Sequence, residues 1–344
     1  MNPVEAVYWR PLPDGAVRCE LCPIGCRLTP GREGPCGTRV NVGGRMLARE
    51  YGRLVSAALD PIEKKPLYHF HPGAAILSVA AQGCNLHCQF CQNWTISQEK
   101  SDLAQDATPD QLVAEARARR SVGIAYTYSE PLVWFEFVRD TAKLARAAGL
   151  RNVIVTNGFL NEAPLRELLP WIDAANVDLK SMDDAFYRKV CKARVEPVLR
   201  TLRLCRELGV HLEVTNLVIP GWNDSDAQLG ALIDFVAGLG RDVPLHFSAY
   251  RPAWKFTAPP TPAATLARAA QLARGKLDFV YAGNVHVEGA TDTICPACGE
   301  VVIERDGYRI RSRLAPGSAG LAVSAGSAVS AVCPGCGRGL PIVV

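Results

Sequence analysis

The chain has no long apolar run, no export signal and no basic cluster. No stretch of about 18 or more apolar residues, the length a membrane-spanning helix needs, occurs in its 344 residues. Residues 1–15 contain neither a basic segment nor an apolar core, so a secretory signal is not indicated. The net charge is only +4, with basic and acidic residues intermixed, which argues against nucleic acid or a membrane as a partner. We therefore expect a soluble, cytoplasmic, unprocessed protein.

Cysteine, by contrast, is abundant. Thirteen cysteines in a large chain without an export signal are better explained by metal binding than by disulfides. Cys191 and Cys205 lie apart in helical-looking sequence, where a small buried apolar residue is expected. The others form three groups: Cys19, Cys22, Cys26 and Cys36; Cys84, Cys88 and Cys91; and Cys295, Cys298, Cys333 and Cys336.

The middle group, Cys84, Cys88 and Cys91, has the spacing C-x3-C-x2-C on one short loop. Three thiolates can hold three irons of a [4Fe-4S] cluster, and no fourth cysteine lies near in sequence to bind the last iron. An open metal position can ligate a substrate or cofactor, so the spacing indicates chemistry. A zinc knuckle or buried free thiols are the alternative, but three cysteines rarely share so short a loop without a metal.

Between residues 74 and 284, short apolar runs alternate with longer amphipathic ones, the pattern of repeated strand–helix units. A helix is expected to begin at Thr108, with Pro109 in its first position and Gln111 completing a capping box, and another to stop near Gly149. Right-handed crossovers would curve the units into a partial parallel barrel whose strands all end at one rim. A doubly wound open sheet is the alternative. Strands are expected at 74–81, 123–128, 152–155, 175–179, 211–219, 244–250 and 277–282.

The string QGCNLHCQFCQNWTISQ at residues 82–98, with Phe90 as the aromatic residue before the third cysteine, resembles a known cluster loop. It is similar to that of the radical S-adenosylmethionine (SAM) superfamily, and most closely to the AmmeMemoRadiSam system radical SAM enzymes, relatives of the pyruvate formate-lyase activating enzymes. The resemblance implies an α/β fold, a partial (βα)6 TIM-like radical SAM barrel. It also implies a [4Fe-4S] cluster whose open iron is chelated by SAM. One electron would cleave SAM to methionine and a 5'-deoxyadenosyl radical, which abstracts a hydrogen atom from the substrate.

The same resemblance suggests where SAM binds. Glu130, in a segment that resembles the one binding the SAM amino group, is the natural acceptor for an ammonium, although an acid at a helix start is also common for the helix dipole. Asp178 and Lys180 could instead be a rim ion pair. The cofactor-binding residues that the resemblance implies are Phe90, Ser129, Glu130, Thr156, Asn157, Asp178, Lys180 and Ile219. His246 is expected at the same rim, where a satisfied core histidine is the commoner role, and no catalytic acid or base is assigned.

The flanking cysteine groups extend beyond the barrel. Residues 1–70 are expected to form an N-terminal metal-binding segment, 71–288 the barrel, and 289–344 a segment like a zinc ribbon. The N-terminal group supplies four thiolates, which suit either zinc or an auxiliary iron-sulfur cluster. The C-terminal group reads as two CxxC knuckles for structural zinc, with rubredoxin-like iron as the alternative. The Ala-, Gly- and Ser-rich stretch 315–331 between the knuckles is expected to be a flexible loop.

Two functions remain open on the sequence. The first is a radical SAM oxidoreductase that takes a hydrogen atom from a protein or peptide, as an activating enzyme does; a small-molecule substrate is equally allowed. It would need a low-potential electron donor such as flavodoxin or ferredoxin. The second is an iron-sulfur and zinc scaffold or electron carrier without SAM chemistry, which leaves the polar residues at the strand ends unexplained.

Overall fold

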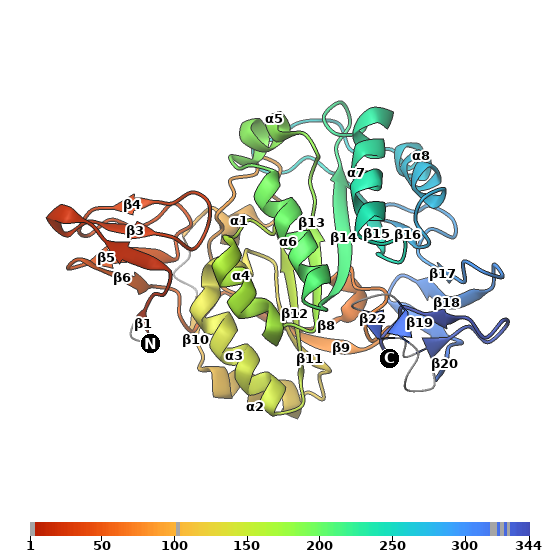
Figure 1. Ribbon diagram of the computed structural model, residues 1–344, viewed down its shortest axis with the longest axis horizontal. Helices are drawn as coiled ribbons and strands as arrows, with labels where there is room; N and C mark the ends of the chain where they lie inside the picture. The colour runs from red at the N-terminus through yellow and green to blue at the C-terminus, as the bar shows by residue number, and fades with distance from the viewer. Residues whose placement is uncertain (1–3, 101–103, 317–321, 324–326, 329–330) are drawn as a thin grey trace.

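A computed structural model describes the chain except residues 1–3, 101–103, 317–321, 324–326 and 329–330. A large sheet with its helices forms the centre of the molecule, and small β-structures made by the two ends of the chain lie on opposite sides of it (Figure 1). None of the helices in these described ranges has the length and apolar character to cross a bilayer.

The central sheet has eight strands in the order in which they follow along the chain. The strands from β9 to β16 are parallel, and β8 pairs antiparallel with β9 at one edge. All seven strands predicted from the apolar runs are confirmed. The eight are β8 (Ser56–Pro61), β9 (Ala75–Ala80), β11 (Gly123–Tyr126), β12 (Arg151–Thr156), β13 (Ala174–Asp178), β14 (His211–Val218), β15 (Leu245–Ala249) and β16 (Val280–Gly283).

The strand order decides between the two predicted architectures. A doubly wound sheet reverses its strand order at a switch point and carries helices on both faces. Here the order from β9 to β16 never reverses, so right-handed crossovers place the connecting helices on one side, as in a barrel. Within the described residues β8 and β16 are the two ends of the sheet, so the barrel is partial. The predicted partial barrel is confirmed, and the doubly wound alternative is wrong.

The helices begin and end where local chemistry favours it. The capping box at Thr108 is present, with Gln111 bonding back to the Thr108 backbone, and Ser225 and Gln228 form a second one before α7. Gly149, after α3, has a φ of 76°, a left-handed conformation that ends the helix at little steric cost. The helices are α1 (Trp94–Ser97), α2 (Pro109–Ala118), α3 (Phe135–Ala147), α4 (Glu162–Leu168), α5 (Asp184–Phe186), α6 (Glu196–Glu207), α7 (Asp226–Leu239) and α8 (Ala263–Arg274).

The N-terminal part forms two three-stranded antiparallel sheets, with the orders β1-β6-β5 and β2-β3-β4. They lie to the left of the barrel in Figure 1. A short pair, β7 (Arg53–Leu54) with β10 (Gln105–Asp106), lies outside both. The strands are β1 (Val4–Glu5), β2 (Trp9–Pro11), β3 (Val17–Cys19), β4 (Arg27–Leu28), β5 (Arg39–Val42) and β6 (Arg45–Ala48).

The C-terminal part consists of short antiparallel strands whose core continues into the barrel, because Phe279 and Tyr281 pack with Val302, Ile303 and Ile342. Its sheets are β17-β18-β19, β20-β23-β24 and β21-β22. The expected flexible loop at 315–331 falls largely outside the described residues, and the part that is described forms short pairs. The strands are β17 (Thr293–Ile294), β18 (Val301–Asp306), β19 (Arg309–Ser312), β20 (Ala315–Pro316), β21 (Ala322–Val323), β22 (Ser327–Ala328), β23 (Ala331–Val332) and β24 (Gly339–Leu340).

Candidate functional site

A cavity of about 310 Å³ opens at the carboxyl ends of the parallel strands. The cluster loop after β9 forms one wall, and the segments that follow β11, β12 and β13 line it together with residues of β14 and β15. Ile219 is not among the lining residues: its side chain is fully buried and its backbone N–H donates to Asn223. The predicted residues at the cavity are Cys84, Cys88, Phe90, Cys91, Ser129, Glu130, Thr156, Asn157, Asp178 and Lys180.

The cysteines of the loop have separate polar contacts, and their sulfur atoms are spread apart. The Leu86 backbone N–H donates to Cys84 Sγ at 3.3 Å, and Ser97 Oγ lies 3.2 Å from Cys91 Sγ. Such donors stabilise a thiolate. The three Sγ atoms of this loop do not lie as close together as the ligands of a single metal ion must. Thiolates that each bind their own iron of a cube stand farther apart, so the loop fits a [4Fe-4S] cluster held by three corners.

A π-helical turn at Tyr187–Cys191 hydrogen-bonds to the backbone of the cluster loop. The His87 N–H donates to the Cys191 carbonyl at 3.0 Å, and the Gln89 N–H donates to the Val190 carbonyl at 3.1 Å. The Cys191 thiol bonds to Cys88 and, together with Lys180, lowers the pKa of the Cys88 thiol despite its burial. Cys191 is fully buried, as predicted, but it also touches a cluster ligand, which nothing in its sequence context indicates.

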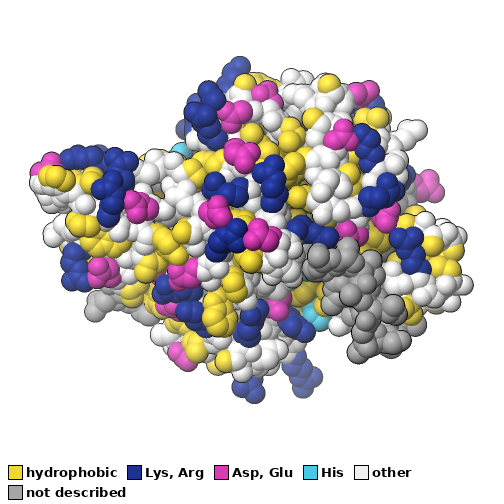
Figure 2. Space-filling model, viewed as in Figure 1, with side chains coloured by type: hydrophobic (Ala, Val, Ile, Leu, Met, Phe, Trp, Pro, Cys, Tyr) yellow, Lys and Arg dark blue, Asp and Glu magenta, His cyan; other side chains and the backbone are white. Residues whose placement is uncertain are grey.

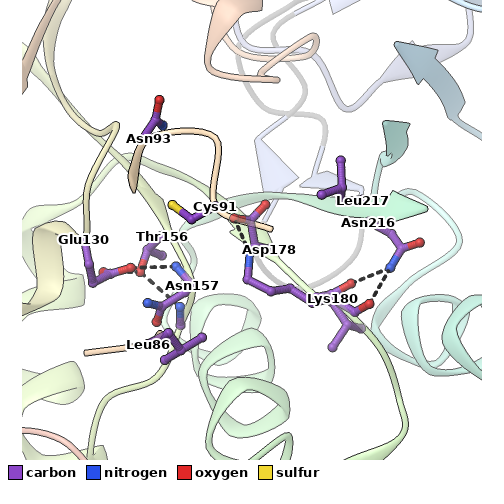
Figure 3. Close-up of polar contacts among 12 residues, drawn as sticks. Leu86, Cys91, Asn93, Glu130, Thr156, Asn157, Asp178, Lys180, Asn216 and Leu217 are labelled. Atoms are coloured by element: carbon purple, nitrogen blue, oxygen red, sulfur yellow. Dashed lines mark hydrogen bonds and ion pairs between the residues drawn. The ribbon is translucent and has the colours of Figure 1, made fainter. Parts of the chain in front are cut away.

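Glu130 connects the ends of two strands (Figure 3). Its Oε1 accepts from Thr156 Oγ1 at 2.6 Å and from the Leu132 N–H at 2.9 Å, and its Oε2 accepts from the Asn157 N–H at 2.8 Å. Burial raises the pKa of this carboxyl to about 7 although all three bonds oppose the rise. A carboxylate offers about four acceptor positions, so one on Oε2 remains for a further donor.

Lys180 and Asp178 form an ion pair on the opposite side, with Nζ 3.0 Å from Oδ2 (Figure 3). The Lys180 ammonium also lies 5.7 Å from the centre of the Phe90 ring. Burial opposes its charge, but Asp178 and Cys88 hold the pKa of Lys180 well above its usual value. Asn216 fixes this segment by donating to the carbonyls of Leu179 and Lys180.

Several residues at the cavity were not predicted. Thr215 and Leu217 lie two residues apart on β14, so both side chains point to the same face of the strand, toward the barrel interior. This period of two could have identified them from the sequence. Lys64 and Tyr128 give no comparable signal. Tyr128 has a φ of 70°, rare for a non-glycine residue, and its hydroxyl contacts Asp60 and Lys65, which pins the segment before Glu130.

His246 is not among the residues that line the cavity. Its Nε2 is 2.6 Å from Glu213 Oε2, and its ring stacks on Tyr281. Glu213 also accepts from the backbone N–H groups of Tyr68 and His69. His246 is therefore a satisfied core histidine, the commoner role for a histidine on an apolar strand.

The C-terminal cysteines form the compact group that the sequence predicts. The Sγ atoms of Cys295 and Cys336 lie 3.7 Å apart, and those of Cys298 and Cys333 lie 3.6 Å apart. Four thiolates arranged tetrahedrally at about 2.3 Å from one ion would stand about 3.8 Å apart. All four ligand atoms fall within 4.8 Å of one another. The group can therefore hold a single metal ion, as a zinc-ribbon-like segment does.

Comparisons with known proteins agree with this geometry. Residues 78–233 match the Radical SAM superfamily. An uncharacterized protein of Methanocaldococcus jannaschii is 46% identical over 306 residues, 88% of this chain and 91% of its own length. Pyruvate formate-lyase 1-activating enzyme of Escherichia coli is 26% identical over 46% of this chain and 67% of its own.

Among solved structures, Streptococcus suis SuiB bound to S-adenosylmethionine aligns with a TM-score of 0.50 at 13% identity, over 61% of this chain and 52% of SuiB. At that identity the likeness concerns the fold alone. The family match, the archaeal relative and the three-cysteine loop at the barrel rim lead to one conclusion: the chain belongs to the radical SAM superfamily and is homologous to the pyruvate formate-lyase activating enzymes.

Proposed function

We propose that this protein cleaves SAM reductively and abstracts a hydrogen atom from a protein or peptide substrate. One observation carries the proposal: Cys84, Cys88 and Cys91 face the same cavity as Glu130 and Lys180. When bound, the cluster and SAM would supply the electron and the 5'-deoxyadenosyl radical. A metal scaffold without SAM chemistry would have no use for the polar residues opposite the cluster loop.

The residues around Glu130 are suited to bind the methionyl amino group. The remaining acceptor position on Glu130 Oε2 can take one N–H of an ammonium, while Thr156 and Asn157 hold the carboxylate in place. Ser129 donates its hydroxyl to the Ala81 carbonyl at 2.5 Å and its backbone N–H to the Thr127 carbonyl at 3.0 Å, so it shapes the turn beside Glu130. Glu130 thus acts as a buried, oriented acceptor.

The pair Asp178 and Lys180 is suited to the other polar groups of SAM. The Lys180 ammonium can pair with the methionyl carboxylate, and Asp178, whose side chain is 36% exposed, can accept from ribose hydroxyls. Asn157 Nδ2 lies 3.5 Å from Cys84 Sγ, so the loop after β12 touches both the cluster ligand and the SAM site. Ile219 would contribute only through its backbone, since its side chain is buried.

The substrate class rests on the relatives. The curated relatives of known activity include enzymes named for activating pyruvate formate-lyase and benzylsuccinate synthase, so a protein substrate is the natural proposal. A low-potential donor such as flavodoxin or ferredoxin would supply the electron. On the face shown in Figure 2 basic and acidic side chains are interspersed, which fits the expectation of no nucleic-acid partner.

The test uses deuterium transfer. Cells of the source organism are grown in deuterated medium, and their extract is separated by size into macromolecules and small molecules. Each fraction is added to cluster-loaded, reduced enzyme with SAM, and the 5'-deoxyadenosine is analysed by mass spectrometry, with Cys88→Ala as control. Deuterium delivered by the macromolecular fraction supports a protein substrate. Deuterium delivered only by the small-molecule fraction contradicts it.

We further propose zinc as the metal of the C-terminal cysteines, because the spacing of these thiols suits one tetrahedral ion and two CxxC knuckles are typical of structural zinc. Rubredoxin-like iron would use the same ligands and is distinguished by its visible colour. The division at residues 70 and 288 is proposed with it, with β8 (Ser56–Pro61) of the N-terminal segment added to the barrel sheet as its antiparallel edge strand.

A further inference from the structure

The N-terminal cysteines form one neighbourhood that the proposed function does not use. Cys19 lies at the end of β3, and its backbone N–H donates to the Cys26 carbonyl at 2.9 Å. The Gly25 N–H donates to the Cys22 carbonyl at 3.2 Å, so the turn after β3 brings three of the cysteines together. Their thiols also lie within electrostatic reach of Cys36. The four cysteines, from the turn after β3 and from the segment before β5, therefore lie near one another.

The spread of these thiols differs from that of the C-terminal set. Among the described residues, only Cys295, Cys298, Cys333 and Cys336 place their sulfur atoms within the 4.8 Å that a single ion allows. Neither any three of the N-terminal thiols nor the three thiols of the loop at Cys84, Cys88 and Cys91 meet that limit. Thiolates around a cube are farther apart than thiolates around one ion, since each binds its own iron.

The N-terminal group also abuts the cluster loop itself. A Cβ built on Gly83, the residue before Cys84, would lie 2.2 Å from the Cys36 carbonyl oxygen, so the two backbones are in direct contact. Gly83 has a φ of 100°, which only glycine adopts readily. The approach of Cys36 to the loop therefore depends on glycine at this position.

A second connection joins the same two segments. Asn161 donates from its backbone to the Leu21 carbonyl at 3.0 Å and from its side chain to the Glu20 carbonyl at 2.7 Å. Asn85, on the cluster loop, donates to the Phe159 carbonyl at 2.6 Å. The loop after β12 thus holds the N-terminal turn on one side and the cluster loop on the other.

We propose that Cys19, Cys22, Cys26 and Cys36 hold a second [4Fe-4S] cluster, against the loop of the SAM-binding one. Four thiolates close its coordination, so it ligates no substrate and is suited to carry an electron. The proposal does not depend on SAM cleavage, because it concerns a separate ligand set, and its test reads iron rather than activity.

The test uses the full chain with Cys84, Cys88 and Cys91 all changed to alanine. After anaerobic reconstitution with iron, sulfide and zinc, we expect about four irons per chain to remain. Reduction with dithionite should give an electron paramagnetic resonance signal that SAM does not alter. Zinc at the N-terminal group, or no metal there, would overturn the proposal.

The reciprocal variant, Cys22→Ser with Cys36→Ser, should lose only this iron and keep the signal that responds to SAM. Where the double variant does not fold, Cys36→Ser alone at its half-buried position serves. The matched control is Cys205→Ser, a fully buried cysteine outside every group, which should leave the iron content unchanged. Equal iron in the reciprocal variant and the unmodified chain would also overturn the proposal.

Discussion

Glu130→Gln is the substitution that tests the proposed SAM site most sharply. The glutamate is 2% exposed and accepts from three donors on two segments, one after β11 and one at the end of β12. In glutamine the oxygen can keep the bonds from Thr156 and Leu132, but the amide nitrogen then faces the Asn157 N–H, donor against donor. The flipped amide is less favourable still, because its nitrogen would face two donors, the Thr156 hydroxyl and the Leu132 N–H. One buried N–H without an acceptor should cost about 1–3 kcal/mol of stability.

The loss in SAM affinity follows from the acceptor position on Oε2. A hydrogen bond between an ammonium and a carboxylate contributes about 1.5–3 kcal/mol, so its removal should weaken SAM binding roughly tenfold to a hundredfold. The assay is anaerobic calorimetry on protein loaded to the same iron content as the unmodified chain. Thermal unfolding of both proteins reports the stability change separately.

Glu136→Gln provides the matched control. Glu136 is equally buried and pairs with Arg39 outside the cavity. Weakening that pair should lower stability by a few kcal/mol and leave the SAM dissociation constant within about twofold. The assignment of Glu130 is refuted if both variants bind SAM as the unmodified protein does, or if both lose affinity in proportion to their stability.

Other predictions concern the surrounding structure. Gly83→Ala should lower stability by about 2 kcal/mol or more because its Cβ meets the Cys36 carbonyl, whereas Gly149→Ala, with a φ of +76° and nothing within 4 Å, should cost only about 1 kcal/mol; equal losses on thermal unfolding would contradict the contact. Cys298→Ser should release about one zinc per chain, measured with a colorimetric chelator; unchanged zinc would place the ion elsewhere. Burial lowers the pKa of His69 to about 3 in the folded protein. Only the unfolded chain therefore takes up a proton at this histidine as the pH falls below about 6.5. Between pH 7.5 and 5.5 this uptake should lower the free energy of unfolding by about 1.4 kcal/mol. His69→Phe should lose that share of the pH dependence in urea unfolding, and an unchanged slope would count against a neutral, buried His69.

Much of the site could be predicted because topology brings strand ends together. Once the alternation identified parallel strands, the residues after β9, β11, β12 and β13 had to meet at one rim. The capping box at Thr108 and the end of the helix near Gly149 could be predicted because both depend on neighbouring residues alone. The cysteine loop needed no fold at all, since its spacing specifies the ligands.

The unpredicted features depend on contacts between distant residues. Nothing in the sequence pattern predicts β8, because its sequence, SAALDP, contains the strand-poor residues Asp60 and Pro61. Proline is tolerated there because β8 is an edge strand. Asp60 then reaches Lys65 and Tyr128, the latter 68 residues away in sequence, an approach that no local period shows. The partner of His246 is likewise on the neighbouring strand, at Glu213.

The central claim is that the cluster loop and the cavity together cleave SAM. The most direct measurement is 5'-deoxyadenosine, detected by mass spectrometry after anaerobic reconstitution, reduction with dithionite and addition of SAM, with Cys88→Ala beside the unmodified chain. The account predicts 5'-deoxyadenosine from the unmodified chain and none from the variant. Cluster-loaded, reduced protein that neither binds SAM nor forms 5'-deoxyadenosine would contradict it.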